Sequence, residues 1–187
     1  EILKKKLLKT NEKVFNSFDS FEIIFKKKKI DYVMSSIIGI NGLEPTYKII
    51  KYTKKIAIAN KETIICGWNL IKKELNKNNS IFIPVDSEHF SLYYALRYIK
   101  RSAIHKIFIT ASGGPFYFNK KINLSSVSKK KVLSHPKWKM GNNNLIDSSN
   151  FINKILEIYE LSYIFNISLD KIDFLISEEA FIHSIIH

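Results

Sequence analysis

Two acidic residues directly follow an apolar run that is typical of a buried strand. The run ends at Val85, and Asp86 and Glu88 come next. Charge inside a buried strand is costly unless it is paired or bound to a metal, so we expect both carboxylates at the strand's exit. Residues two apart in an extended backbone point to one side, and two such oxygen ligands suit Mg²⁺ or Mn²⁺. Alternatively, both are helix N-terminal acids favoured by the helix dipole.

Polar residues also end two other apolar runs. Asn-Lys-Glu at 60–62 follows the run 54–59, and Ser112 stands before two glycines after the run 106–111. Ligands of open parallel sheets bind at the carboxyl ends of the strands, so we expect the three strand ends to meet in one site. The backbone N–H groups of Ser-Gly-Gly suit a phosphate, although the same residues also suit a tight turn.

A later helix carries three polar residues on one face. Its N-cap is expected at Ser148 or Ser149, and Asn153, Lys154 and Glu157 follow at helical spacing. A helix N-terminus with free N–H groups binds phosphate, and Lys154 is placed to assist. The alternative is an exposed Lys154–Glu157 ion pair of little energetic value.

The segment 117–141 is expected to be a lid loop. Most of it is rich in Lys, Asn and Ser and lacks periodicity, and it ends in His135, Trp138, Met140 and Gly141. A long loop followed by bulky side chains is typical of a lid that closes over a ligand and excludes water. The alternative is a surface loop anchored by Trp138.

Apolar runs alternate with helical patterns along the chain, which indicates an α/β fold with a mostly parallel sheet. Strands are expected at 54–59, 80–85, 106–111 and 172–176, and helices at 60–77 with Asn60 as N-cap, 88–102 and 149–165.

The composition indicates a globular protein of a reducing compartment. Of 187 residues, 45% are hydrophobic, and the single Cys66, expected in a helix core, excludes an internal disulfide. No apolar run approaches the roughly 18 residues of a transmembrane helix, so we expect no membrane partner. The net charge of +13 comes almost entirely from lysine, without the aromatic residues of a base-stacking platform. We therefore expect a solvated basic surface and no nucleic-acid partner.

With these residues identified, the chain resembles the 1-deoxy-D-xylulose 5-phosphate reductoisomerase family. The resemblance spans about residues 31–184 and follows the family's order. It rests on VMSSIIGINGLEPT (33–46), AIANKET (57–63), PVDSEH (84–89), ASGGPF (111–116), HPKWKMG (135–141) and IDSSNFINKILE (146–157).

The resemblance implies a role for each matching residue. The implied metal ligands are Asp86, Glu88 and Glu157. The implied substrate contacts are Lys61, Ser87, Glu88, Ser112, His135, Ser148, Asn153, Lys154 and Glu157. Contacts to NADPH are implied for Asn60, Glu62 and Gly141, and a cover over the site for Trp138 and Met140.

The resemblance also implies an activity and an architecture. The activity is the rearrangement and NADPH-dependent reduction of 1-deoxy-D-xylulose 5-phosphate to 2-C-methyl-D-erythritol 4-phosphate, an isoprenoid precursor of the non-mevalonate pathway, with Mg²⁺, Mn²⁺ or Co²⁺. Residues 1–86 would be the C-terminal part of a Rossmann-like NADPH-binding domain, and 87–187 an α+β catalytic domain. A homodimer is implied, in a bacterial cytoplasm or a plastid-type organelle.

The chain departs from the family pattern in several places. Residues 1–30 contain no glycine, so the Gly-rich NADPH segment is expected outside this chain. Ser177 to Ala180 replace a His-Pro-Gln-Ser stretch, and Ile155 replaces a glycine. We expect a diverged reductoisomerase shortened at both ends and inactive by itself. The alternative is a non-catalytic remnant that binds a divalent metal and a phosphorylated ligand.

Overall fold

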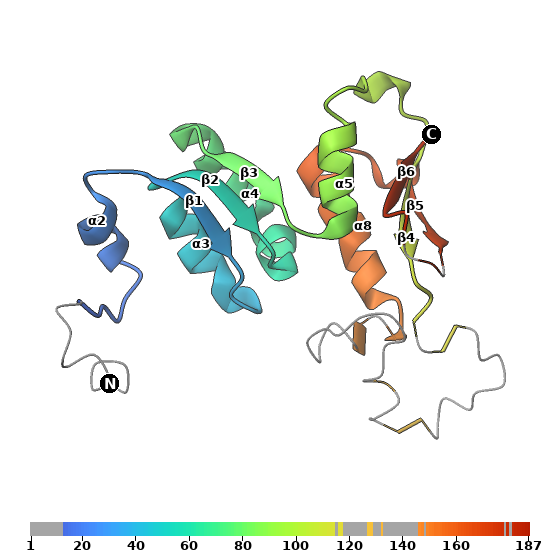
Figure 1. The fold of residues 1–187 in the computed structure, drawn as a ribbon, viewed down its shortest axis with the longest axis horizontal. Helices are drawn as coiled ribbons and strands as arrows, with labels where there is room; N and C mark the ends of the chain where they lie inside the picture. Colours follow the sequence, from blue (N-terminus) through green and yellow to red (C-terminus); the bar gives the residue numbers. More distant parts are fainter. Residues whose placement is uncertain are drawn as a thin grey trace.

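The structure, a computed structural model, contains two three-stranded sheets with helices packed against each (Figure 1). It describes residues 13–114, 116–117, 127–128, 132, 146–147, 149–177, 179 and 181–187. In chain order its elements are α2 (Ser20–Phe25), β1 (Ile30–Ser35), η1 (Ile40–Gly42), α3 (Leu43–Ile50), β2 (Thr53–Ile58), α4 (Lys61–Asn78), β3 (Ile81–Pro84), α5 (Ser87–Ala95), η2 (Arg101–Ala103), β4 (Ile107–Ala111), α8 (Ile152–Phe165), η4 (Leu169–Lys171), β5 (Ile172–Ile176) and β6 (Ser184–Ile186).

The first sheet is entirely parallel, in the order β1-β2-β3. Helices α3 and α4 pack against it through a core that includes Ile50 on α3, Ile56 on β2, and Ile64 and Ile71 on α4. Parallel strands joined by helices require such a covered face. This arrangement confirms the α/β interpretation for the first half of the chain.

The second sheet has the order β5-β4-β6, with β4 parallel to β5 and antiparallel to β6. Its core joins Leu92 on α5, Ile107 and Ile109 on β4, and Leu161 on α8. Within the described residues, β4 pairs only with strands of this second sheet. The single parallel sheet on which the prediction of one shared site was based is therefore wrong for the third strand end, because the chain leaves the first sheet after β3.

The predicted elements agree well with the observed ones, with two exceptions at helix ends. The strand at 172–176 is confirmed residue for residue, and Asn60 caps α4 as predicted. Helix α5 ends at Ala95, well before residue 102, and α8 begins at Ile152 rather than near 149. The predicted domain boundary between residues 86 and 87 falls in the short link between β3 and α5. The division into two domains at this point stays a prediction.

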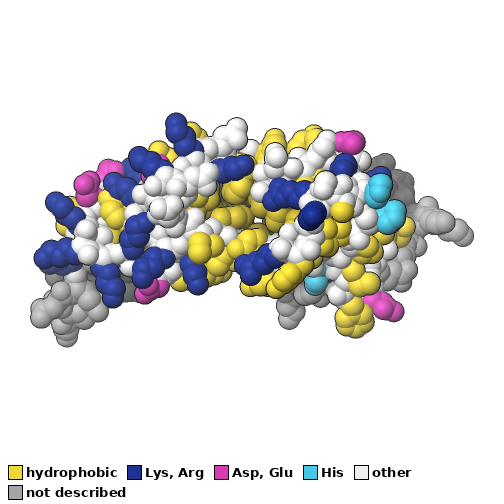
Figure 2. All heavy atoms as spheres, turned by 90° about the horizontal axis from the view of Figure 1, so that it is seen from above, with side chains coloured by type: hydrophobic (Ala, Val, Ile, Leu, Met, Phe, Trp, Pro, Cys, Tyr) yellow, Lys and Arg dark blue, Asp and Glu magenta, His cyan; other side chains and the backbone are white. Residues whose placement is uncertain are grey.

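Lysine and arginine side chains are dispersed over the face seen in Figure 2, where they alternate with apolar and neutral groups. Among the described helices, none combines the length and apolar character that crossing a membrane requires.

Candidate metal centre

The loop between β2 and α4 positions Lys61. Asn60 lies in extended conformation, and its side-chain oxygen accepts a hydrogen bond from the backbone N–H of Thr63, 2.5 Å away. Its amide nitrogen donates to the carbonyl oxygens of Gly39, at 2.8 Å, and of Ile37. An N-cap of this kind satisfies a free N–H group of the first helical turn. Lys61 is consequently fixed as the first residue of α4.

Asp86 is placed by the junction of β3 and α5. It is the N-cap of α5, and its Oδ1 accepts a hydrogen bond from the backbone N–H of Glu88 at 3.3 Å. The expected extended spacing of Asp86 and Glu88 is therefore wrong, because Glu88 already lies in the first helical turn. The alternative, that both are acids at the N-terminus of a helix, describes the backbone correctly. The two carboxylates nevertheless point to the same place.

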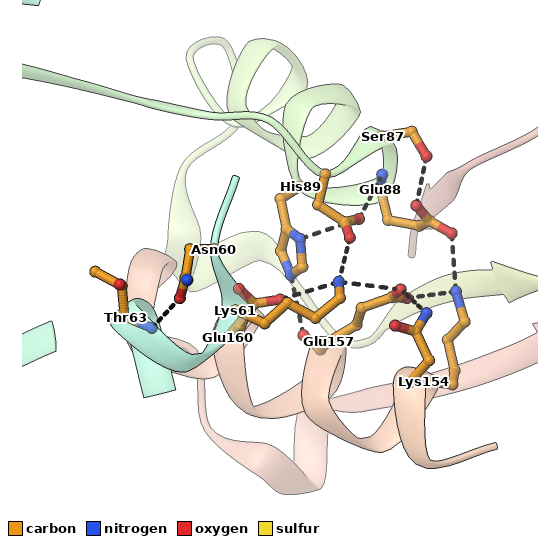
Figure 3. A network of polar contacts seen from close by, with 11 residues as sticks. Asn60, Lys61, Thr63, Ser87, Glu88, His89, Lys154, Glu157 and Glu160 are labelled. Atoms are coloured by element: carbon orange, nitrogen blue, oxygen red, sulfur yellow. Dashed lines mark hydrogen bonds and ion pairs between the residues drawn. The ribbon is translucent and has the colours of Figure 1, made fainter. Parts of the chain in front are cut away.

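Three carboxylates from two helices converge at this point (Figure 3). Asp86, Glu88 and Glu157 each offer an oxygen within 4.8 Å of the other two. Glu157 comes from α8, and its side chain is only 3% exposed. The structure thus brings together the three residues predicted as metal ligands, and three carboxylates are a ligand set that Mg²⁺ and Mn²⁺ prefer.

One half-buried lysine, Lys61, and one buried lysine, Lys154, lie among these carboxylates. Lys61 forms an ion pair with Asp86, and its Nζ is 3.4 Å from Oε1 of Glu157. The Nζ of Lys154 is 2.8 Å from Oε1 of Glu88 and 2.5 Å from Oε2 of Glu157. Because Lys154 and Glu157 are both buried, the alternative of an exposed surface pair is wrong.

Burial and neighbouring charges shift the pKa values of this cluster in opposite directions. Burial opposes the charged form of Lys61, but the negative charges of Asp86, Glu160 and Glu157 outweigh it and raise its pKa. Burial likewise opposes ionisation of Asp86, yet the Lys61 ammonium and the His89 hydrogen bond hold the pKa of Asp86 well below its usual range. Burial and the Asp86 charge together raise the pKa of Glu157 to about 7. The carboxylates of Asp86 and Glu157 therefore differ in how readily they take up a proton.

His89 lies behind the carboxylates, in agreement with the interpretation from the sequence that it adjoins the metal pair without being a metal ligand. Its Nδ1 is 3.3 Å from Oδ1 of Asp86, and its Nε2 is 3.0 Å from the backbone carbonyl oxygen of Glu157. Burial opposes the charged ring, but the hydrogen bond to Asp86 and the charge of Asp86 prevail and raise the pKa of His89 to about 9. The protonated ring donates to both α5 and α8 and so connects the two helices.

Glu160 is a further buried acid that the sequence analysis missed. It lies on α8, and its Oε2 is 3.4 Å from Nζ of Lys61. With Asp86 and His89 it forms a second group whose ligand atoms lie within 4.8 Å of one another. The available signal was its position three residues after Glu157, which places both side chains on one helix face.

Several predicted substrate contacts lie beside the cluster. The hydroxyl of Ser87 donates to Oε2 of Glu88 at 2.6 Å, and the amide of Asn153 donates to Oε1 of Glu157 at 2.5 Å. Ser149 is not the N-cap of α8, because its hydroxyl donates to the carbonyl oxygen of Ile146 and helical structure starts only after Phe151.

Ser112 follows β4 and therefore belongs to the end of the second sheet. The predicted residues His135, Trp138, Met140, Gly141 and Ser148 lie outside the described residues.

A cleft of about 500 Å³ adjoins the cluster. Asn60, Lys61 and Glu62 line it on one side, and Leu156 lines it on the other. Cys66 also lines this cleft and is exposed, so the prediction that it belongs to the core is wrong. Its neighbours Ile64, Gly67 and Trp68 are buried instead, and Cys66 lies on the exposed side of α4.

The fold and the site define an α/β protein with a carboxylate-rich candidate metal centre beside a cleft of ligand-binding size. The family model for 1-deoxy-D-xylulose 5-phosphate reductoisomerase matches residues 1–67, and the model for the C-terminal domain of that family matches residues 82–165. The chain belongs to the 1-deoxy-D-xylulose 5-phosphate reductoisomerase family.

Curated relatives agree with this assignment. The 1-deoxy-D-xylulose 5-phosphate reductoisomerase of Pelagibacter ubique is 49% identical over 187 residues, which is 99% of this chain and 48% of that protein. The protein of the same name from Clostridium botulinum is 40% identical over 173 residues, which is 92% of this chain and 45% of that protein. The chain therefore spans about half the length of the relatives it matches.

Solved structures of this family superpose closely on the chain. The enzyme from Zymomonas mobilis in complex with NADPH gives a TM-score of 0.82 at 29% identity, covering 99% of this chain and 47% of that one. A reductoisomerase in complex with NADPH, fosmidomycin and magnesium gives a TM-score of 0.85 at 28% identity, covering 99% and 48%.

Proposed function

We propose that the whole protein is an NADPH- and divalent-metal-dependent reductoisomerase that converts 1-deoxy-D-xylulose 5-phosphate into 2-C-methyl-D-erythritol 4-phosphate. The observation that carries this proposal is that the ligand atoms of Asp86, Glu88 and Glu157, the three residues implied as metal ligands by the sequence, lie within 4.8 Å of one another. The relatives' names and the complexes of structural neighbours with NADPH and magnesium support it.

The residues present fit a divalent cation. Among the described residues, the four carboxylates of Asp86, Glu88, Glu157 and Glu160 face three cationic groups, the ammonium groups of Lys61 and Lys154 and the protonated ring of His89. The surplus of negative charge in a largely buried site favours binding of a cation. Asp86, Glu88 and Glu157 would hold the metal, which when bound supplies Lewis acidity to oxygens of the substrate.

The lysines provide binding and charge for an anionic substrate. Lys154 lies in the first turn of α8 beside Glu88, and Lys61 borders both the carboxylates and the cleft. We assign contacts to the sugar phosphate to both lysines and to Ser87, Ser112 and Asn153. We assign contacts to the sugar phosphate to His135 and Ser148 as well, on the basis of the sequence alone.

The cleft is the proposed place of the nicotinamide cofactor. Asn60 and Glu62, the predicted NADPH contacts, both line it. Lys61 lines it as well and contacts the proposed metal ligands Asp86 and Glu157. A cofactor bound there would lie next to the reacting carbons, and the protein's part is to hold that orientation. Gly141, Trp138 and Met140 remain assigned from the sequence to the cofactor contact and the lid.

We also propose the remaining features of the family for the whole protein. Residues 1–86 would complete an NADPH-binding domain and 87–187 would form the catalytic domain, with two copies joined as a homodimer. The relatives named above are bacterial, which supports a bacterial cytoplasm as the compartment over a plastid-type organelle.

Calorimetry with Mn²⁺ tests the metal centre directly. Binding should be lost in the Asp86→Asn/Glu157→Gln variant and should be tightened by 1-deoxy-D-xylulose 5-phosphate in the unchanged protein. The Asp170→Asn variant, which alters an exposed acid outside the cluster, should bind Mn²⁺ normally. Binding that survives the double substitution would refute the ligand set, and binding indifferent to the sugar phosphate would favour the non-catalytic remnant.

A further inference from the structure

Lys61 is shared between two kinds of partner (Figure 3). On one side its ammonium pairs with Asp86 and lies 3.4 Å from Glu157, which are proposed metal ligands. On the other side it lies 3.4 Å from Oε2 of Glu160. The Lys61 side chain is 17% exposed, so these carboxylates, rather than water, provide most of its stabilisation.

A divalent cation on Asp86 and Glu157 would compete with this ammonium. Two positive charges within a few ångströms repel each other strongly in a buried site. Lys61 then needs a negative partner outside the ligand set, because a buried ammonium without one is costly. Glu160 meets this need, since its side chain is 6% exposed, contacts Lys61 and is separate from the Asp86–Glu88–Glu157 group.

We propose that Glu160 is a positioning residue that retains the ammonium of Lys61 at the wall of the cleft and thereby leaves Asp86 and Glu157 to the metal. This inference rests on the proposed metal centre. It assigns Glu160 an effect on metal affinity that acts through Lys61 and not through a bond to the metal.

Two rival roles predict a different dependence on Lys61. Glu160 could be a ligand of the metal, because it groups with Asp86 and His89 within 4.8 Å. It could also attract the cation simply through its negative charge. Neither role requires a lysine at position 61, so a double-mutant cycle separates them from the proposal.

The experiment is Mn²⁺ titration by calorimetry of four proteins: the unchanged protein, Glu160→Gln, Lys61→Met and the double variant. Loss of a side chain that supports metal ligands costs about tenfold in affinity, and we expect this loss for Glu160→Gln. Lys61→Met should bind Mn²⁺ more tightly than the unchanged protein. Adding Glu160→Gln to Lys61→Met should then change the affinity by less than about twofold.

An equal loss of affinity from Glu160→Gln in both backgrounds would overturn the proposal in favour of a ligand or a simple charge. No loss in the unchanged background would overturn it as well. Glu160→Asp provides a second route if Gln prevents folding, which circular dichroism would reveal. It keeps the charge but shortens the reach to Lys61, so affinity should fall, whereas unchanged affinity would support the simple-charge role and contradict ours.

A fifth Mn²⁺ titration, of an Asp86→Asn variant, separates this inference from the proposed function. If the unchanged protein binds no Mn²⁺, or if Asp86→Asn leaves binding intact, the metal centre itself is refuted and the role of Glu160 is refuted with it. If Asp86→Asn abolishes binding while Glu160→Gln has no effect, only the role of Glu160 is refuted.

Discussion

The imidazole of His89 donates from Nε2 to the backbone carbonyl oxygen of Glu157, at 3.0 Å, and this contact joins α5 to α8. Its other nitrogen faces Asp86 at 3.3 Å. One buried ring therefore fixes the distance between two proposed metal ligands that lie far apart in the sequence. Support of this kind, behind the ligands themselves, sets both their orientation and their basicity.

His89 should make the stability of the fold depend on pH. Its pKa is raised from 6.5 to about 9, so the folded protein holds this proton more tightly than the unfolded chain. The stabilisation is fully present below about pH 6.5 and is lost as the pH rises through about 9, a change of roughly 3 kcal/mol. Urea unfolding over this range should follow that decline, and a His89→Gln variant should be less stable at low pH and nearly flat. An equal decline in the variant would assign the effect to another group.

Glu157 should make Mn²⁺ binding stronger as the pH rises. With a pKa of about 7, Glu157 holds a proton in about half of the molecules at neutral pH, and that proton must leave before a metal binds. We expect the affinity to rise between about pH 6 and about pH 8 and then to level off. Calorimetry in two buffers with different ionisation enthalpies would count the released protons. Constant affinity without proton release would contradict the assignment.

Gly42 should be intolerant of a side chain. A Cβ there would lie 2.6 Å from the carbonyl oxygen of Ile37 and 2.8 Å from Nδ2 of Asn60. Gly42→Ala should therefore disturb the Asn60 cap and lower the free energy of unfolding by about 1–3 kcal/mol. Gly39→Ala is the matched control, since its Cβ meets open space and only its positive φ opposes the change. An equal or smaller loss for Gly42→Ala than for Gly39→Ala would refute the steric argument.

Cys66 should report on occupancy of the cleft. It is exposed, lines the cleft and is the single cysteine of the chain, so a thiol reagent should label one site on the folded protein. NADPH should slow this labelling several-fold if it binds beside Asn60 and Glu62, because access to the thiol would be blocked. Labelling that requires denaturant would contradict the exposed position, and equal rates with and without NADPH would contradict the cofactor assignment.

Local features of the sequence predicted local structure well. Asn60 stands between an apolar run and a helical pattern, and asparagine is a preferred N-cap residue at such a position. The strand Ile172–Ile176 has boundaries that the apolar pattern alone defines. The ligand set Asp86, Glu88 and Glu157 depended instead on resemblance, because no spacing rule connects α5 with α8.

Features that depend on tertiary packing were not predictable in this way. The alternation of strands and helices does not say which sheet a strand joins, so β4 was wrongly expected in the same sheet as β2 and β3. Cys66 has apolar neighbours on both sides of its helix, and only the packing of α4 decides which side faces the cleft. The contacts of His89 and Glu160 likewise appear only once α4, α5 and α8 are together.

Ile164 contacts the hydrophobic cores of both sheets, so α8 packs against both cores. The same helix carries Glu157 and Glu160, whereas Lys61 belongs to α4 and Asp86 is the N-cap of α5. A rotation of one sheet relative to the other would therefore change the spacing of the charged cluster. Cation affinity and the angle between the sheets are consequently coupled quantities, and by thermodynamic reciprocity a ligand that alters one must alter the other.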